Sequence, residues 1–221
     1  MDAPLSPTLP PPPSLYDISP PLGPATPLYP GDEPFALRWL ARIGPGSPIN
    51  LGALTVSPHS GAHADAPLHY AAGAPAIDQV DLSAYLGPCR VLHTIGVGPL
   101  VTVAALRAAG AATADLPPRV LLRTCERAST VWDPNFTAID PAALSWLAER
   151  GVRLVGIDTP SVDPADSTAL DAHQALHRHD LRVLENLVLD AVPAGDYELI
   201  ALPLKLVGAC ASPVRAVLRR P

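Results

Sequence analysis

Short blocks of apolar residues recur along the chain after about residue 50, separated by turns rich in Gly, Pro and Asp, a pattern typical of strands. Helices are expected at 102–109, over a segment that begins at Pro141 after the cap Asp140 and ends at Gly151, and as a single turn at 173–178. The expected strands are 51–57, 90–96, 119–124, 153–157, 197–206 and 214–218. The pattern therefore predicts a strand-rich α/β fold.

The first part of the chain differs because 14 of the 29 prolines lie within residues 1–48. Each proline removes a backbone donor and favours extended geometry in the residue before it, so this region can form neither a helix nor a central strand. We expect residues 14–48 to form an extended arm that lies over the rest of the protein. Residues 1–13 are expected to be a disordered proline-rich extension, and residues 14–221 a single domain.

Composition and charge narrow the class of protein. Of the 221 residues, 48% are hydrophobic and 16% are charged, which is typical of a globular protein, and no apolar run approaches the ~20 residues of a membrane helix. The net charge of −6 comes without a basic stripe, which argues against nucleic acid as a partner. Three widely spaced cysteines and an N-terminus unlike a secretory signal favour the cytoplasm.

Three of the seven histidines lie in one eleven-residue stretch, which contains His59, His63, Asp65 and His69. All four positions are odd, so an extended chain would place them on one side. A straight strand would hold His59 and His63 ~13 Å apart at ~3.3 Å per residue, so we expect a bend at Gly61. Two imidazoles and a carboxylate suit zinc or a similar divalent ion, and three ligands leave positions open for catalysis. The alternative is a surface loop, which the intervening Ser, Ala and Leu do not favour.

A second group gives a weaker signal and consists of His173, His177, His179 and Glu185. His177 and His179 resemble exposed polar residues, whereas Glu185 lies in an apolar stretch and would need a partner such as a metal ion. His93 is expected to be a core or edge histidine and not a ligand. The motifs of serine hydrolases, nucleotide-binding proteins and His-Glu-x-x-His metalloproteases are absent from the sequence.

The stretch His59-Ser-Gly-Ala-His-Ala-Asp-Ala-Pro-Leu-His69 resembles the His-x-Gly-Thr/Ala-His-x-Asp-x-Pro-x-His signature of the metal-dependent cyclase-like hydrolases. Further segments resemble the bacterial kynurenine formamidases of that family, from about residue 14 to the C-terminus. They are Tyr16-Asp-Ile-Ser19, Pro24-Ala-Thr-Pro27, Pro30-Gly-Asp32, Tyr85-Leu-Gly-Pro-Cys89, Gly156-Ile-Asp-Thr-Pro-Ser161 and Asp196-Tyr-Glu-Leu-Ile-Ala-Leu-Pro-Leu-Lys205. The resemblance implies a cyclase-like swivelling β/β/α domain with a proline-rich extended N-terminal arm.

The same resemblance implies a binuclear zinc amidase, an arylformamidase that hydrolyses N-formyl-L-kynurenine to L-kynurenine and formate in tryptophan degradation. It also implies a homodimer. Carried over by position, His59 and His63 would bind one zinc, Asp65 would bridge two zinc ions, His173 would bind the second, and Glu185 would join the set.

The resemblance also bears on His69, Tyr29 and Ser60. His69 would be the proton shuttle. Tyr29 stands where the family commonly has Trp, and its ring would line the substrate pocket of its own or the partner subunit. Without the resemblance, the simpler interpretation of Tyr29 is a ring that anchors the arm to the surface. Ser60 replaces the usual Thr, a change of little chemical consequence.

Two alternatives stay open at this point. Another enzyme of the same scaffold, acting on a different amide, imide or lactone, would keep the metal residues and differ in its pocket. A metal-binding or scaffold protein without activity would instead have a closed site, with four or more protein ligands on every ion.

Overall fold

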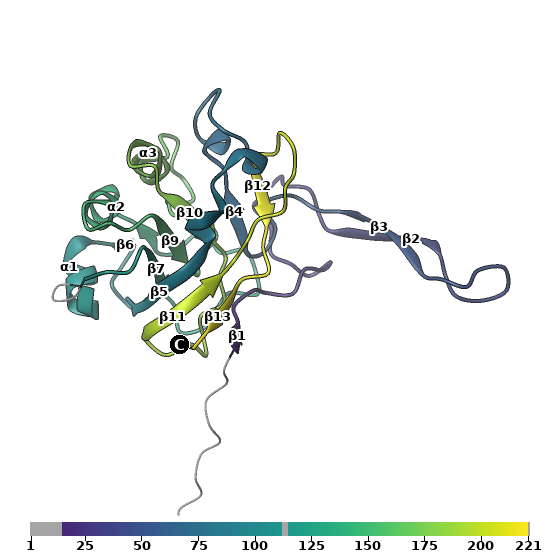
Figure 1. Cartoon of the computed structure of the whole chain (residues 1–221), viewed down its shortest axis with the longest axis horizontal. Helices are drawn as coiled ribbons and strands as arrows, with labels where there is room; N and C mark the ends of the chain where they lie inside the picture. Colours follow the sequence, from purple (N-terminus) through teal and green to yellow (C-terminus); the bar gives the residue numbers. More distant parts are fainter. Residues whose placement is uncertain (1–14, 112–114, 221) are drawn as a thin grey trace, which may run out of the picture.

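A nine-stranded mixed sheet forms the centre of the computed structural model, which describes residues 15–111 and 115–220 (Figure 1). Neighbouring strands β5, β7, β9 and β10 run parallel, and antiparallel strands extend the sheet on both sides. In sheet order the strands are β1 (Leu15–Asp17), β13 (Val217–Arg219), β11 (Gly195–Ile200), β5 (Leu86–His93), β7 (Arg119–Arg123), β9 (Leu154–Ile157), β10 (Arg182–Glu185), β4 (His63–Asp65) and β12 (Ala211–Pro213). The predicted α/β class is confirmed.

Helices cover one face of the parallel strands (Figure 1). They are α1 (Val103–Leu106), which continues into the turn Arg107–Ala111, α2 (Pro141–Ala148) and α3 (Asp171–Arg178). The Thr102 and Asp140 side chains cap α1 and α2 by accepting backbone N–H groups at their first turns. Because β7 is covered on both faces, Val120 and Leu122 pack under the helices while Leu121 packs on the opposite side.

The opposite face closes on a second apolar core formed by the curled antiparallel strands. Ile18, Tyr85 and Leu199 are fully buried there, from the segment after β1, from a 3₁₀ helix and from β11. The 3₁₀ helices are η1 (Pro67–His69), η2 (Ile77–Gln79) and η3 (Leu82–Tyr85), and two short strands, β6 (Leu100–Val101) and β8 (Ala138–Ile139), pair in parallel beside the main sheet. The two cores fix β4 and β10, which hold the candidate site.

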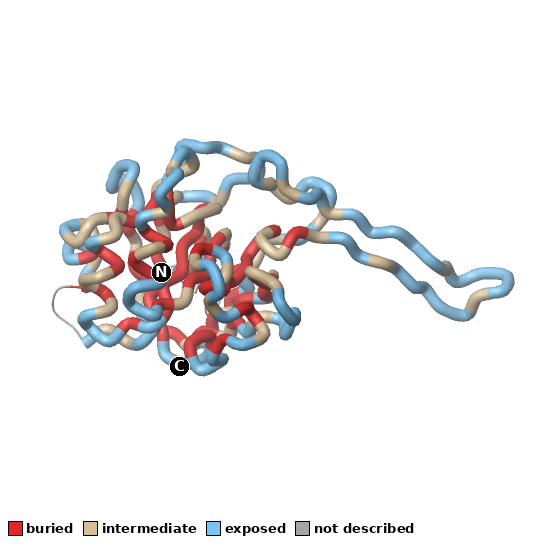
Figure 2. The backbone as a smooth tube through the Cα atoms, turned by 90° about the horizontal axis from the view of Figure 1, so that it is seen from above, coloured by how far each residue is buried: buried red, intermediate tan, exposed pale blue. Residues whose placement is uncertain are grey.

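One hairpin projects away from this body, formed by β2 (Ala36–Ala41) and β3 (Leu51–Thr55) (Figure 1). Figure 2 shows it exposed along most of its length. The expected arm at 14–48 is therefore not one extended segment lying over the protein. It begins as the edge strand β1 and later forms β2, because residues 36–41 contain no proline and can pair with β3.

Other differences from the expected elements have local causes. The strand predicted at 197–206 ends at Ile200, since Pro203 lacks a donor and the backbone N–H of Leu204 is bound by the Ser212 hydroxyl. The last strand lies at Val217–Arg219 and not at 214–218, and strands β4, β10 and β12 were not expected as strands at all. The extension expected at 1–13 lies outside the described residues.

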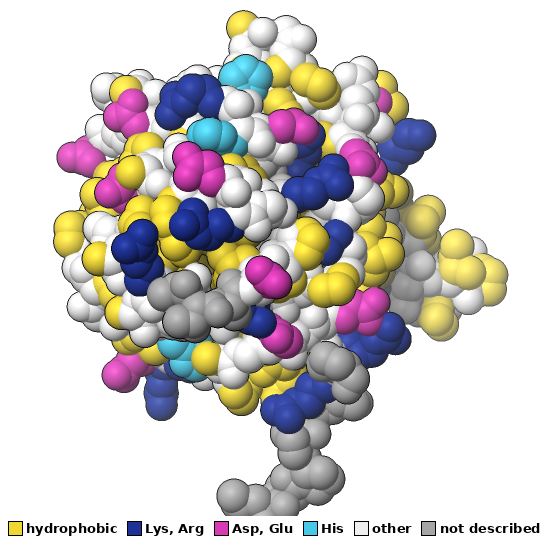
Figure 3. All heavy atoms as spheres, turned by 60° about the vertical axis from the view of Figure 1, so that its left-hand side comes forward, with side chains coloured by type: hydrophobic (Ala, Val, Ile, Leu, Met, Phe, Trp, Pro, Cys, Tyr) yellow, Lys and Arg dark blue, Asp and Glu magenta, His cyan; other side chains and the backbone are white. Residues whose placement is uncertain are grey.

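Charge is mixed on the face that Figure 3 presents, where basic and acidic side chains are interspersed. Among the described residues, none of the helices combines the length and the apolar character needed to cross a bilayer.

Candidate metal centre

Strand β4 holds two of the expected ligands and lies between β10 and β12. His63 is paired in register with Glu185 of β10, so these two side chains are held next to one another by the sheet. Asp65 follows two residues later and thus lies on the same face of β4 as His63. His173 comes from the first turn of α3, and His59 from the turn before β4. The fold therefore brings all five expected ligands together.

The bend expected at Gly61 is present. Gly61 has φ +60°, in the left-handed region, and a Cβ atom built there would lie 2.5 Å from Leu22 Cδ2. This bend turns His59 back toward β4, where its ring centroid lies 5.1 Å from that of His63. A straight strand would have kept the two rings apart.

Asp65 is the hub of the cluster. Its Oδ1 lies 3.0 Å from His59 Nδ1 and 3.4 Å from His63 Nε2, and its Oδ2 lies 3.3 Å from His173 Nε2. Glu185 joins through Oε2, 3.2 Å from His63 Nε2, and through Oε1, 3.7 Å from His173 Nε2. Among the described residues, every ion pair of Asp65 and Glu185 is with histidine. No fixed cation therefore balances these two carboxylates there.

His63 and His173 instead favour their protonated, positively charged forms beside these carboxylates. Burial alone would lower the pKa of His63, but the hydrogen bond to Glu185 and the charge of Asp65 raise it to about 9. Burial likewise opposes the charged form of His173, but its bonds to Asp163 and Asp65 raise its pKa to about 10. Burial would raise the pKa of Asp65, yet the His173 bond and the neighbouring imidazole charges hold it well below its usual range. The buried cluster therefore favours positive charge on His63 and His173 beside an ionised Asp65.

These residues fit a divalent ion. Asp65 Oδ1 is fully buried and has no hydrogen-bond partner among the described residues, although His59 Nδ1 and His63 Nε2 lie close to it. Nitrogen and oxygen atoms that approach without bonding are arranged as ligands are around a shared cation. The outer nitrogens of two rings are already bound: His63 Nδ1 lies 2.9 Å from the Gly61 carbonyl oxygen, and His173 Nδ1 lies 2.6 Å from Asp163 Oδ2. Such outer contacts are typical of metal-ligating histidines.

His69 lies at the edge of the cluster, on η1, with an exposed side chain. Its ring centroid is 4.3 Å from that of His59 and 5.7 Å from that of His173. A ring nitrogen of His69 lies within 4.8 Å of a ring nitrogen of His59 and of Cys210 Sγ, and likewise within 4.8 Å of a carboxylate oxygen of Asp65 and a ring nitrogen of His173. Desolvation at this wall lowers the pKa of His69, so the neutral ring is favoured. The position suits proton transfer, and the role remains a prediction.

A cavity of about 720 Å³ opens above the cluster and is lined by His59, His63, His69, His173 and Glu185. Part of its wall is aromatic: Tyr29, Trp132 and Phe136 line it, with Tyr29 packed edge-on against Trp132 at 5.0 Å between ring centroids. Tyr29 thus lies at the pocket of its own chain, and its ring is 57% exposed. Its role in binding substrate stays a prediction.

Sequence reasoning missed several residues of the site. Asp163 binds the outer nitrogen of His173, Cys210 Sγ lies 3.4 Å from His59 Nε2, and Trp132 and Phe136 build the pocket wall. Cys210 is 151 positions from His59, so no local spacing could have linked them. His93 is half-buried and its Nε2 lies 2.9 Å from the Val192 carbonyl oxygen, in agreement with the structural role expected for it.

Comparison with known proteins places this geometry in a family. The Cyclase family model, described as "Putative cyclase", matches residues 16–164. The chain belongs to the cyclase family. Curated relatives called kynurenine formamidase include those of Delftia acidovorans, 59% identical over 93% of this chain and 97% of the relative, and of Bordetella pertussis, 57% identical over the same shares.

Solved structures of the family have the same architecture. One described as "The Structure Of Potential Metal-Dependent Hydrolase With Cyclase Activity" superposes with a TM-score of 0.78 at 26% identity, over 94% of this chain and 98% of the other. The cyclase-like fold predicted from the motifs is therefore confirmed. The predicted resemblance to the kynurenine formamidases is also confirmed, and this member of the cyclase family is an enzyme of the hydrolase class.

Proposed function

We propose that this protein is a zinc-dependent arylformamidase that hydrolyses N-formyl-L-kynurenine to L-kynurenine and formate in the kynurenine pathway of tryptophan degradation. The observation that supports it most is the convergence of three histidines and two carboxylates at the floor of an aromatic pocket. The names of relatives at 57% and 59% identity over nearly the whole chain support the choice of substrate. We place the reaction in the cytoplasm, consistent with three cysteines that are all unpaired.

In this proposal, His59, His63, Asp65, His173 and Glu185 would hold two divalent ions, and Asp65 would be shared between them. When bound, zinc supplies a Lewis acid that polarises the formyl carbonyl and lowers the pKa of water. Asp65 is suited to bridging because its two oxygens face different rings, His59 and His63 on one side and His173 on the other. The sheet holds β4 and β10 in register, so the ligands need little rearrangement.

His69 would transfer the protons of the reaction. Its neutral ring at the pocket wall can accept a proton from the attacking water and then donate it to the aniline nitrogen as the C–N bond breaks. The products are formate, a free aryl amine and one proton released to solvent, so one water is consumed and no covalent intermediate with the protein is needed.

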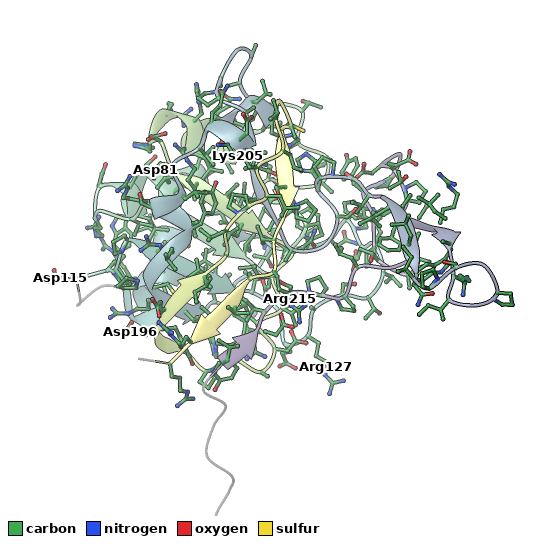
Figure 4. The ribbon with its side chains drawn as sticks, turned by 45° about the vertical axis from the view of Figure 1, so that its right-hand side comes forward. Asp81, Asp115, Arg127, Asp196, Lys205 and Arg215 are labelled. Atoms are coloured by element: carbon green, nitrogen blue, oxygen red, sulfur yellow. The ribbon has the colours of Figure 1, made fainter. Side chains whose placement is uncertain are left out.

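The aromatic wall would bind the substrate ring. Tyr29 and Trp132 present apolar surface above the cluster, and stacking on an aniline ring adds ~0.5 to 1.5 kcal/mol beyond area burial. Arg127 also belongs to the lining, but Figure 4 shows its side chain pointing out at the rim.

Formate release from a panel of substrates tests this assignment. The panel contains N-formyl-L-kynurenine, N-formylaniline, an alkyl formamide, a cyclic imide and a lactone, with ring opening followed for the last two. We expect kcat/KM to be highest for N-formyl-L-kynurenine. A higher value for the imide or the lactone would assign the scaffold to the alternative substrate class.

We further propose a homodimer in which the hairpin β2–β3 packs against a second copy. An isolated two-stranded hairpin is marginal in water, and this one exposes large apolar side chains, including Leu37 at 50%, Trp39 at 42% and Leu54 at 58%. The same chain offers a second apolar surface in the loop before β12. That loop exposes Leu202, Leu204, Leu206 and Val207.

A further inference from the structure

Each of the three histidines of the cluster has one ring nitrogen directed to the centre and the other directed outward. For His63 and His173 the outward nitrogen meets an oxygen, the Gly61 carbonyl and the Asp163 carboxylate respectively. For His59 the inward atom is Nδ1, 3.0 Å from Asp65 Oδ1, and the outward atom is Nε2, 3.4 Å from Cys210 Sγ. The partner of the third ring is thus a thiol.

We propose that Cys210 is a positioning residue of the metal centre. Its sulfur accepts the Nε2–H of His59, which fixes the tautomer that leaves the Nδ1 lone pair free to bind an ion. The inference rests on the metal centre proposed above and adds to it a residue that acts through His59.

The backbone around Cys210 holds the thiol in this position. The Cys210 carbonyl accepts the backbone N–H of Ala66 at 2.8 Å, and the next residue, Ala211, pairs in register with Asp65. The segment that supplies the thiol is therefore bonded directly to the strand that supplies His63 and Asp65. Figure 4 shows Lys205 in the loop that leads into β12, at this edge of the sheet.

The other two cysteines lie elsewhere and serve as references. Cys89 is buried in the core on β5. Cys125 is half-buried and lines the same pocket, but its thiol donates to Asp158 Oδ2 at 3.1 Å. Of the three, Cys210 is the one whose sulfur contacts a ring of the cluster.

A direct ligand role for Cys210 is the competing interpretation, because the donor atoms of His59, His69 and Cys210 lie within 4.8 Å of one another. If His59 bound an ion through Nε2 beside this sulfur, its Nδ1 would carry the proton and donate to Asp65 Oδ1. That oxygen has no hydrogen bond among the described residues. The geometry therefore favours Nδ1 as the metal-binding atom and the thiol as its outer partner.

Cobalt(II) binding by the full chain separates these roles without reference to activity. Removing the outer partner of a metal-bound histidine typically weakens metal binding ~10 to 100-fold. We expect Cys210→Ala to show such a loss of cobalt affinity in competition with a chelator. Cys210→Ser should recover most of the affinity because a hydroxyl oxygen also accepts the His59 N–H. The control Cys125→Ala should bind cobalt as the native chain does. We expect no sulfur-to-cobalt charge-transfer absorption in any of the four proteins.

Two results would overturn the proposal. Charge-transfer absorption in the native chain that Cys210→Ala lacks would make Cys210 a direct ligand, and equal cobalt affinity in the native and Cys210→Ala proteins would remove it from the centre. Far-UV circular dichroism of the metal-free proteins checks that each variant folds. If Cys210→Ala does not fold, Cys210→Ser serves as the test variant. The outcome is independent of the substrate, so failure of the formamidase assignment would show up separately.

Discussion

The metal cluster and the projecting hairpin are adjacent in sequence and opposite in environment. Strand β3 ends at Thr55, four residues before His59, yet Leu54 is 58% exposed while Asp65 is 1% exposed. One region buries carboxylate side chains, and the other exposes large apolar side chains to solvent. Each environment is costly for its side chains unless a further component is bound. The comparison motivates the two proposals made above, a cation for the cluster and a second copy of the chain for the hairpin.

Removing Asp65, the hub of the cluster, should have the largest effect, on both metal content and activity. Asp65→Ala removes both oxygens that the three rings face, so metal content should fall further than in any single histidine variant. Because the ion contributes several kcal/mol to the transition state, activity should fall by ~10³ or more. Elemental analysis and steady-state kinetics measure both, with the exposed Asp166→Ala as the matched control. A full metal complement in Asp65→Ala would contradict the bridging role.

His69, at the edge of the cluster, should affect kcat and not metal content. His69→Ala should keep its metal and its fold while kcat falls by ~10², the usual scale for a proton-transfer residue. The exposed His177→Ala is the control and should leave kcat unchanged. Loss of metal in His69→Ala would instead make His69 a ligand, as its distance to the cluster also permits.

The hairpin should affect association and leave the metal in place. Leu37→Glu puts a charge on the proposed interface, and removal of a central contact of ≥2 kcal/mol corresponds to a dimer Kd at least ~30-fold higher. Sedimentation equilibrium measures this, and Leu82→Glu is the control because Leu82 is also 50% exposed but lies on η3, away from the hairpin. An unchanged Kd in Leu37→Glu would assign the dimer contact to another surface, and a native chain that is monomeric at all concentrations would remove the dimer.

Changing Tyr29 in the pocket wall should have the smallest effect, which is expected on KM. Tyr29→Ala should raise KM by ~2 to 12-fold with metal content unchanged, the range set by a stacking energy of ~0.5 to 1.5 kcal/mol. Tyr29→Trp should be close to neutral or better, because indole can stack on the same ring. If KM of Tyr29→Ala equals that of the native enzyme, Tyr29 is an anchor of the arm and not a substrate contact.

Part of the site could be predicted because three of the five expected ligands lie close together in the sequence. The spacing of His59, His63 and Asp65 and the glycine between them predicted a bent chain with its donors on one side, and the bend lies at Gly61. Buried β7 and the capped start of α2 were predicted for similar reasons, since a continuous apolar run and an Asp-Pro pair are local signals.

What the sequence did not predict depends on contacts between distant segments. Cys210 contacts His59 only because β12 pairs with β4, and Asp163 contacts His173, which lies ten positions later on α3. Short strands such as β4 and β12 have three residues each, too few for a periodic pattern. Of the hairpin, β3 was expected as a strand at 51–57, but β2 was missed because the prolines around it favoured one extended arm, although residues 36–41 themselves contain none.

Formate release from N-formyl-L-kynurenine, measured on one preparation before chelation, after chelation and after zinc is returned, tests the central claim most directly. The account predicts that activity disappears as the metal is removed and returns with zinc, because the buried carboxylates and histidines hold the ion on which the reaction depends. Full activity in protein shown by elemental analysis to be free of metal would contradict it.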